Sequence, residues 1–165
     1  MNYHNITKDD MLNGSGLRTV LWVSGCGHHC PGCQNPVTWD PQGGLPFDRA
    51  AEEEFLEAAG RDYMTGVTFS GGDPLYPANR EEIGRLCQAV KGRFPDKTIW
   101  LYTGYLWEDP AVQQLPWLPL VDLLVDGPFV EALKDNKLHW CGSSNQRIID
   151  VPKSLAAGSA VLWKG

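Results

Sequence analysis

Three cysteines lie within eight residues, in the segment CGHHCPGC at positions 26–33. Cys26, Cys30 and Cys33 have the spacing C-x3-C-x2-C, and no fourth cysteine is close to them. The surrounding glycines and proline disfavour a regular helix, so a loop is expected. Thiolates on a loop can enclose an iron-sulfur cluster, and a cluster of four irons normally takes four of them. Three ligands would leave one iron open to a small molecule, and the spacing favours such a cluster.

A structural zinc site is the alternative interpretation of the same segment. His28, His29 or Cys141 could complete its four ligands. Structural zinc usually uses two ligand pairs of the C-x2–4-C kind, whereas this segment offers one compact triplet. The two histidines are therefore interpreted as loop residues beside a cluster, and Cys141 as a free thiol. Cys87, on the apolar stripe of a predicted helix, is interpreted as a buried structural thiol.

The segment FSGGDPL, at positions 69–75, is the second candidate. Gly71 and Gly72 follow a predicted strand and let the backbone approach a ligand closely, before Asp73 and Pro74 turn the chain. Alone, such a segment is at least as often a simple turn. In a parallel α/β fold, however, it lies at the carboxyl end of a strand next to the cysteine segment. Both segments are expected to face one crevice.

The composition limits the class of protein. The chain has 165 residues and a net charge of −6 without a run of like charges, which argues against nucleic acid or an anionic membrane as the main partner. No apolar run approaches the roughly 20 residues that span a bilayer, and the N-terminus lacks a signal sequence. Five cysteines, clustered and odd in number, indicate metal or redox chemistry in a reducing compartment. We therefore expect a cytoplasmic protein.

Apolar runs that alternate with helical patterns predict an α/β fold. Strands are predicted at 19–24, 67–70, 98–102, 121–125 and 148–151, with 160–163 as a weaker sixth. Asp48 is expected to cap a helix that runs to residue 59, and Asn79 with Glu82 to begin a second helix. The apolar face of this second helix carries Ile83, Leu86, Cys87, Val90 and Phe94. The stretch 36–47 is expected to be a surface loop.

The spacing of these elements implies βα units with right-handed crossovers. Eight such units need about 250 residues, so the chain has room for fewer. We predict a single domain over residues 1–165, an open partial (βα) barrel of five to six mostly parallel strands. Its functional loops are expected at the carboxyl ends of the strands.

The cysteine triplet followed by SGGDP resembles the radical S-adenosylmethionine enzymes. The set GCGHHCPGCQNPVTWD, FSGGDPL, WLYTGY, LLVDGPF and GSSNQRIIDV, spread over residues 25–151, resembles a subgroup of short members, the activating proteins of anaerobic ribonucleoside-triphosphate reductases. Two positions depart from the common pattern. Gly32 stands where many superfamily members have an aromatic residue, and Cys141 stands where the subgroup more often has Arg.

The resemblance implies a 4Fe-4S cluster with three cysteine ligands and one open iron, which binds the amino and carboxylate groups of S-adenosylmethionine. The implied cluster ligands are Cys26, Cys30 and Cys33. The implied cofactor-binding residues are Gly32, Cys33, Gln34, Gly71, Gly72 and Asp73. Of these, the glycine-rich turn would receive the methionine amino group, and the backbone at 32–34 would lie against the adenine. Thr103 and Asn145 are weaker candidates for contacts to ribose or carboxylate.

The resemblance also implies the reaction and the partners. An external low-potential donor such as flavodoxin or ferredoxin would supply an electron, and the cofactor would be cleaved to methionine and a 5′-deoxyadenosyl radical. The radical would remove a hydrogen from one glycine of the reductase. The protein would thus be an oxidoreductase whose reaction requires no acid-base pair of residues. A homodimer or a complex with the reductase is compatible with this role. One alternative is a different substrate, either another glycyl-radical enzyme or a small molecule. The other is a non-enzymatic zinc module. Asp126 is expected either to form a turn or to face the site.

Overall fold

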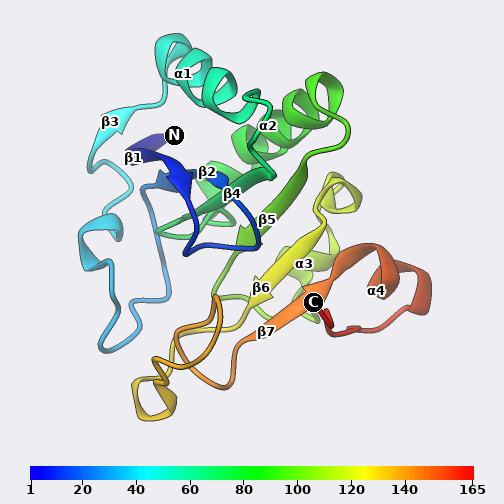
Figure 1. The fold of residues 1–165 in the computed structure, drawn as a ribbon. Coiled ribbons are helices and arrows are strands. Elements are labelled where there is room, and N and C mark those ends of the chain that lie inside the picture. The colour runs from blue at the N-terminus through cyan, green and yellow to red at the C-terminus, as the bar shows by residue number, and fades with distance from the viewer.

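The computed structural model describes residues 1–165 as an α/β fold built on one mixed sheet of seven strands (Figure 1). Their spatial order is β3-β1-β2-β4-β5-β6-β7. The strands are β1 Asn2–Asp10, β2 Arg18–Val23, β3 Leu45–Pro46, β4 Gly66–Gly71, β5 Thr98–Tyr102, β6 Leu123–Asp126 and β7 Arg147–Asp150. The central strands β2, β4, β5 and β6 are parallel, and β1, β3 and β7 are antiparallel to their neighbours.

The α/β class and the parallel centre are confirmed, but the predicted count of five to six strands is wrong. The two strands at the N-terminal edge were missed. β1 is mostly polar, and Ile6 is its only buried residue. A strand near the edge of a sheet has little contact with the core, so its sequence lacks the apolar run that the prediction relied on. β3 has two residues and lies inside the predicted loop 36–47. The weak strand at 160–163 forms only an isolated bridge between Ile149 and Leu162.

The α-helices are α1 Arg49–Ala59, α2 Arg80–Arg93, α3 Pro110–Gln113 and α4 Val151–Ala157, and short 3-10 helices cover Pro36–Thr38, Pro77–Asn79, Leu118–Leu120 and Glu131–Leu133. α1 is capped as predicted, because Asp48 accepts a hydrogen bond from the backbone N–H of Ala51. The predicted cap of α2 is wrong. Asn79 forms no cap bond, and its side-chain amide instead donates to the backbone oxygens of Ser24 and Asp73. None of the helices combines the length and the apolar character that crossing a bilayer requires.

One face of the sheet packs against the helices. Side chains alternate between the two faces of a strand, and Leu21, Phe69 and Leu101 share a single apolar cluster with residues from all four α-helices. The predicted apolar stripe of α2 belongs to this cluster, with Cys87 fully buried and Phe94 packed at its margin. Figure 1 shows α1 and α2 on the same side of the sheet.

The other face of the sheet is covered by a smaller group of aromatic side chains. Trp100 on β5 contacts Trp140 and Trp163, with ring centroids 5.4 Å and 5.3 Å away. Arg18 fills the same face near the amino ends of the parallel strands, fully buried, with its guanidinium 5.6 Å from the Trp100 ring. Oxygens of neighbouring residues accept from all of its nitrogens. Burial lowers the pKa of Arg18 to about 10.

Candidate metal centre and cofactor cavity

A cavity of about 140 Å³ lies at the carboxyl ends of the four parallel strands. Its lining includes the three clustered cysteines, the glycine-rich turn and the ends of β5 and β6, namely Cys26, Cys30, Cys33, Gly71, Gly72, Asp73, Thr103, Gly104 and Gly127. The structure therefore brings the cysteine segment and the SGGDP turn to one crevice, as the parallel arrangement predicts. Figure 1 shows the segment after β2 and the segment between β6 and β7 extending from the same edge of the sheet.

The cysteine segment is a loop between β2 and the first 3-10 helix. Backbone hydrogen bonds fix its first residues. The N–H of Gly25 donates to the oxygen of Thr38 at 2.7 Å, and the N–H of Cys26 donates to the oxygen of Trp39 at 3.1 Å. Its three thiols are half-buried and none forms a disulfide. Burial raises the pKa of the Cys26 thiol, against the lowering effect of nearby backbone N–H groups. No group of three or more Cys, His, Asp or Glu side chains surrounds the position of a single metal ion.

The glycine-rich turn packs backbone against backbone on the end of β2 and on the start of this loop. Gly71 has a φ of 106°, and a Cβ atom there would lie 2.5 Å from the nitrogen of Val23. A Cβ atom on Gly72 would lie 2.5 Å from the carbonyl oxygen of Gly25. The carbonyl oxygen of Gly72 accepts no hydrogen bond from the backbone, although the residue lines the cavity. The turn thus contains a carbonyl that no backbone donor uses, at a lining position where only glycine fits.

The carboxylate of Asp73 is buried and surrounded by donors. Thr103 Oγ1 donates to both of its oxygens at 2.9 Å, and the backbone N–H of Gly104 donates at 3.0 Å. The N–H of Leu75 donates at 2.8 Å, and Nε2 of His28 lies 2.7 Å from Oδ2. The hydrogen bond to Asp73 raises the pKa of His28, against the opposing effect of burial. Asp73 therefore links the glycine-rich turn, the end of β5 and the cysteine loop.

The remaining candidate residues from the sequence are distributed unevenly. Cys33 and Gln34 line a second cavity of about 300 Å³, which shares Cys33, Ser70, Tyr102, Phe129 and Gln146 with the first. Gly32 lines neither cavity and approaches the carboxylate of Glu131.

Of the two weaker candidates, Thr103 and Asn145, only Thr103 lines a cavity. Thr103 lines the first cavity, whereas Asn145 lines neither and donates its amide to the oxygen of Pro128. Gln146, which sequence reasoning missed, lines both cavities. The only signal for it was its place beside Asn145 in the GSSNQ motif.

The second cavity is lined by aromatic residues and by a cysteine outside the triplet. Trp22, Tyr102, Phe129 and Trp140 contribute side chains, together with Cys141. Burial, followed by the charge of Asp126, raises the pKa of the Cys141 thiol to about 11. Cys141 forms no disulfide and does not line the first cavity with the cysteine triplet.

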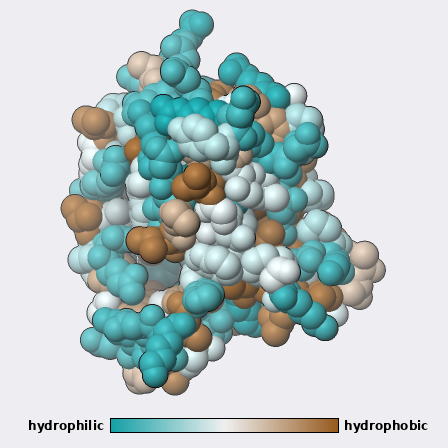
Figure 2. Space-filling view, in the orientation of Figure 1, coloured by the Kyte–Doolittle hydropathy of each residue, from teal (hydrophilic) through white to brown (hydrophobic).

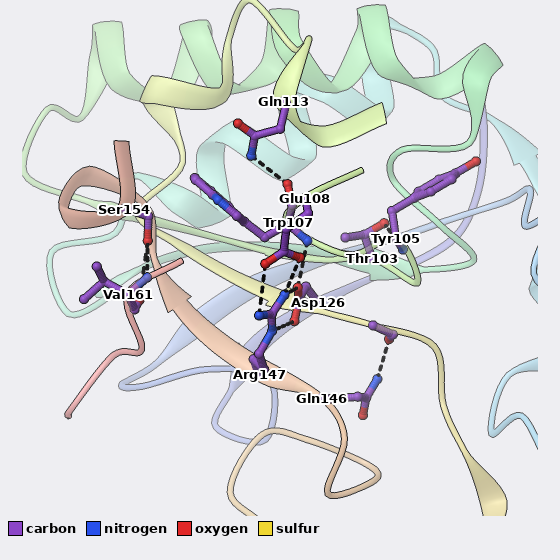
Figure 3. A network of polar contacts seen from close by, with 11 residues as sticks. Thr103, Tyr105, Trp107, Glu108, Gln113, Asp126, Gln146, Arg147, Ser154 and Val161 are labelled. Atoms are coloured by element: carbon purple, nitrogen blue, oxygen red, sulfur yellow. Dashed lines mark hydrogen bonds and ion pairs between the residues drawn. The ribbon is translucent and has the colours of Figure 1, made fainter. Parts of the chain in front are cut away.

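Asp126 neither faces the first cavity nor forms a turn with its own backbone. It is fully buried at the end of β6, where its carboxylate pairs with Arg147 and accepts from the backbone N–H of Trp107 at 2.8 Å (Figure 3). Arg147 also reaches Glu108, and Gln146 donates to the oxygen of Gly127 at 3.0 Å (Figure 3). The network ties β7 to the segment that follows β5.

Comparison with known proteins places this site in a family. A family model described as a 4Fe-4S single cluster domain matches residues 12–149. The anaerobic ribonucleoside-triphosphate reductase-activating protein of Enterobacteria phage T4 is 47% identical over 148 residues, which cover 90% of this chain and 93% of the relative. The protein of the same name from Escherichia coli K12 is 44% identical, covering 88% and 96%, and that of Haemophilus influenzae is 42% identical, covering 90% and 97%. With similarity of this extent, the chain belongs to the family of anaerobic ribonucleoside-triphosphate reductase-activating proteins and contains a 4Fe-4S single cluster domain.

Proposed function

We propose that this protein activates an anaerobic ribonucleoside-triphosphate reductase by generating a glycyl radical in it. The observation that carries the proposal is the meeting of three thiols from one loop with the glycine-rich turn in a single cavity. The names of relatives that are 42–47% identical over about nine tenths of the chain supply the reductase as the protein substrate.

The residues present fit a 4Fe-4S cluster with one open iron. Cys26, Cys30 and Cys33 would hold it, because thiolates are the usual ligands of such clusters. The unpaired carbonyl of Gly72 and the charge of Asp73 suit the ammonium group of S-adenosylmethionine. When bound, such a cluster would supply the electron for reductive cleavage of this cofactor, and the resulting 5′-deoxyadenosyl radical would take a hydrogen from the target glycine.

The protein's own residues position the cofactor and exclude water. The backbone of Cys33 and Gln34, beside the aromatic walls of the second cavity, suits the planar adenine. Gly32 contributes the turn that brings Cys33 to both cavities, with a φ of 76°. Thr103 holds the carboxylate of Asp73 in place. This division of work is usual for cofactor enzymes, in which the protein supplies orientation and electrostatics.

We further propose that the sheet is an open partial barrel of the radical S-adenosylmethionine type. Its parallel centre, the helices packed on one face and the cavity at the carboxyl ends of the strands support this. An external donor such as flavodoxin or ferredoxin would supply the electron, in the reducing cytoplasm that clustered free thiols require. Either a homodimer or a complex with the reductase would be the working assembly.

Figure 2 shows a mainly hydrophilic face on which hydrophobic residues are scattered. Leu12, 81% exposed, lines the second cavity. A segment of the reductase can therefore approach the cofactor from the side of this cavity.

The test is anaerobic reconstitution followed by metal analysis and spectroscopy. Iron and sulfide in the ratio of a 4Fe-4S cluster are expected, and a reduced mixture with the reductase should show a glycyl doublet in electron paramagnetic resonance. Stoichiometric zinc without sulfide would favour the zinc module instead. If the cofactor is cleaved but the glycyl doublet forms in a different glycyl-radical enzyme and not in the reductase, the proposed chemistry is correct and the proposed protein substrate is wrong.

A further inference from the structure

We infer that His28 is a positioning residue that couples the cysteine loop to the cofactor-binding turn. The inference rests on the proposed function and deepens it, because it assigns to this histidine the spacing between the cluster and S-adenosylmethionine. The sequence favoured His28 as a loop residue beside a cluster, with a zinc ligand as the alternative, and neither the proposed cluster ligands nor the reaction chemistry uses it.

The first observation is the hydrogen bond between the His28 ring and Asp73. Nε2 lies 2.7 Å from Oδ2, and since a carboxylate can only accept, Nε2 carries the proton. The side chain of His28 is 20% exposed and that of Asp73 is 1% exposed, so little water competes for the bond. No other side chain of residues 26–33 donates a hydrogen bond to the glycine-rich turn.

The second observation is the close packing of the same ring at the end of β5. A Cβ atom on Gly104 would lie 2.5 Å from Cδ2 of His28, so the ring rests directly on the backbone there. The Tyr105 ring meets it edge to face, with the centroids 4.6 Å apart at 74°. Tyr105 is itself covered by the guanidinium of Arg80, 5.6 Å from its centroid. The ring is therefore fixed by contacts on several sides as well as by its hydrogen bond.

The third observation is the position of His28 in the loop. It stands two residues from both Cys26 and Cys30, so a shift of its ring moves the backbone that carries both thiols. Its partner Asp73 directly follows Gly72, whose carbonyl is the free acceptor of the turn. Productive sites hold their groups to within about 0.5 Å. The backbone N–H of Asp73 donates to the oxygen of Gly25 at 2.7 Å, and His28 adds a side-chain link between the two segments farther along the loop, between two of its thiols.

His29 provides a matched comparison inside the same loop. Its ring stacks on Trp39, with centroids 4.6 Å apart and planes at 11°, and it makes no hydrogen bond to the turn. The two histidines have the same chemistry and neighbouring positions, and only one of them connects the loop to the cofactor-binding turn. A general effect of altering the loop would appear at both positions, whereas coupling would be lost only at His28.

The experiment compares His28→Phe, His28→Gln and His29→Phe with the unaltered protein after anaerobic reconstitution. Phe keeps an aromatic ring without the donor, and Gln restores a donor at a similar reach. Iron and sulfide content is measured first. Equilibrium dialysis of S-adenosylmethionine against the unreduced protein then gives a dissociation constant that does not depend on turnover, and the electron paramagnetic resonance spectrum of the reduced cluster is recorded with and without the cofactor.

We expect His28→Phe to keep its iron and sulfide but to bind S-adenosylmethionine about fivefold or more weakly, the lower end of typical coupling between sites. Its spectral response to the cofactor should be smaller. His28→Gln should recover most of the affinity, and His29→Phe should match the unaltered protein. Gly104→Ala, which displaces the ring while keeping His28, is expected to weaken binding in the same direction.

Two results would overturn the inference. The first is that His28→Phe binds S-adenosylmethionine with unaltered affinity and spectral response. The second is that His28→Phe loses iron and sulfide, which would mean that His28 supports only the cysteine loop. Failure of the proposed function is distinguishable from either, since the unaltered protein and His29→Phe would then show no response to S-adenosylmethionine.

Discussion

Arg147 at the start of β7 pairs with the buried carboxylate of Asp126 at the end of β6, with 3.0 Å between Nε and Oδ1. Asp126 also accepts from the backbone N–H of Trp107, in the segment that follows β5. That segment begins with Thr103 and Gly104, both of which donate to Asp73. An ion pair outside the first cavity thus helps to fix one of its walls.

Replacing Arg147 should destabilise the fold more than replacing its exposed partner. Arg147→Leu leaves the buried Asp126 carboxylate with only a backbone donor, and we expect a loss of about 2 kcal/mol in the free energy of unfolding. Glu108→Gln, at a side chain that is 60% exposed, should cost less than about 1 kcal/mol. Urea unfolding of the cluster-free protein measures both. Equal losses would mean that burial of Asp126 does not determine the energetics of the network.

The five cysteines should separate into two groups. Cys26→Ala, Cys30→Ala and Cys33→Ala are each expected to abolish reductive cleavage of S-adenosylmethionine, because each removes a ligand of the proposed cluster. Cys87→Ala, in the apolar core, should retain iron, sulfide and cleavage and lose about 1 kcal/mol of stability. Methionine and 5′-deoxyadenosine are quantified after reduction. An equal loss of activity at Cys87 would contradict this assignment.

Two glycines provide a matched pair for the turn. Gly72→Ala places a Cβ atom 2.5 Å from the Gly25 oxygen, so the turn must separate from the cysteine loop and cofactor affinity should fall at least about tenfold, or about 1.4 kcal/mol. Gly92→Ala, in α2 with nothing within 4 Å of the added atom, should stabilise the protein by about 0.5–1 kcal/mol. Titration with the cofactor and thermal unfolding test the two expectations. Normal cofactor affinity in Gly72→Ala would show that the turn can accommodate the added Cβ atom without a change in the cofactor site.

The Cys141 thiol should react slowly at neutral pH. Burial raises its pKa to about 11, so the reactive thiolate is scarce below that value and increases as the pH rises toward it. In a variant with Cys26, Cys30 and Cys33 all replaced by Ala, the alkylation rate of Cys141 should rise about tenfold per pH unit from 7 to 10. Mass spectrometry of the labelled peptide follows the reaction. A plateau near pH 8.5 would show an ordinary, well-solvated thiol.

Local sequence patterns predicted the features that depend on near neighbours. The C-x3-C-x2-C spacing and the SGGDP turn identified seven of the 17 residues that line the first cavity, and Asp48 was identified as a helix cap from its position alone. The apolar stripe of α2 was also read correctly, down to Cys87. Each of these depends on the period of a helix or strand, or on what the backbone of a few consecutive residues needs.

The sequence by itself thus determined the chemistry of this protein, through the three thiols, the glycine turn and the βα alternation that brings them together. Only the tertiary structure decided which distant groups meet. His28 and Asp73 are 45 residues apart in the chain, and Asn79 leaves its predicted cap to bind Ser24, 55 residues away. The polar β1 joins the sheet at its edge by backbone pairing with β2. Such contacts depend on the order of the strands and on the partners available to a buried polar group, which no local pattern contains.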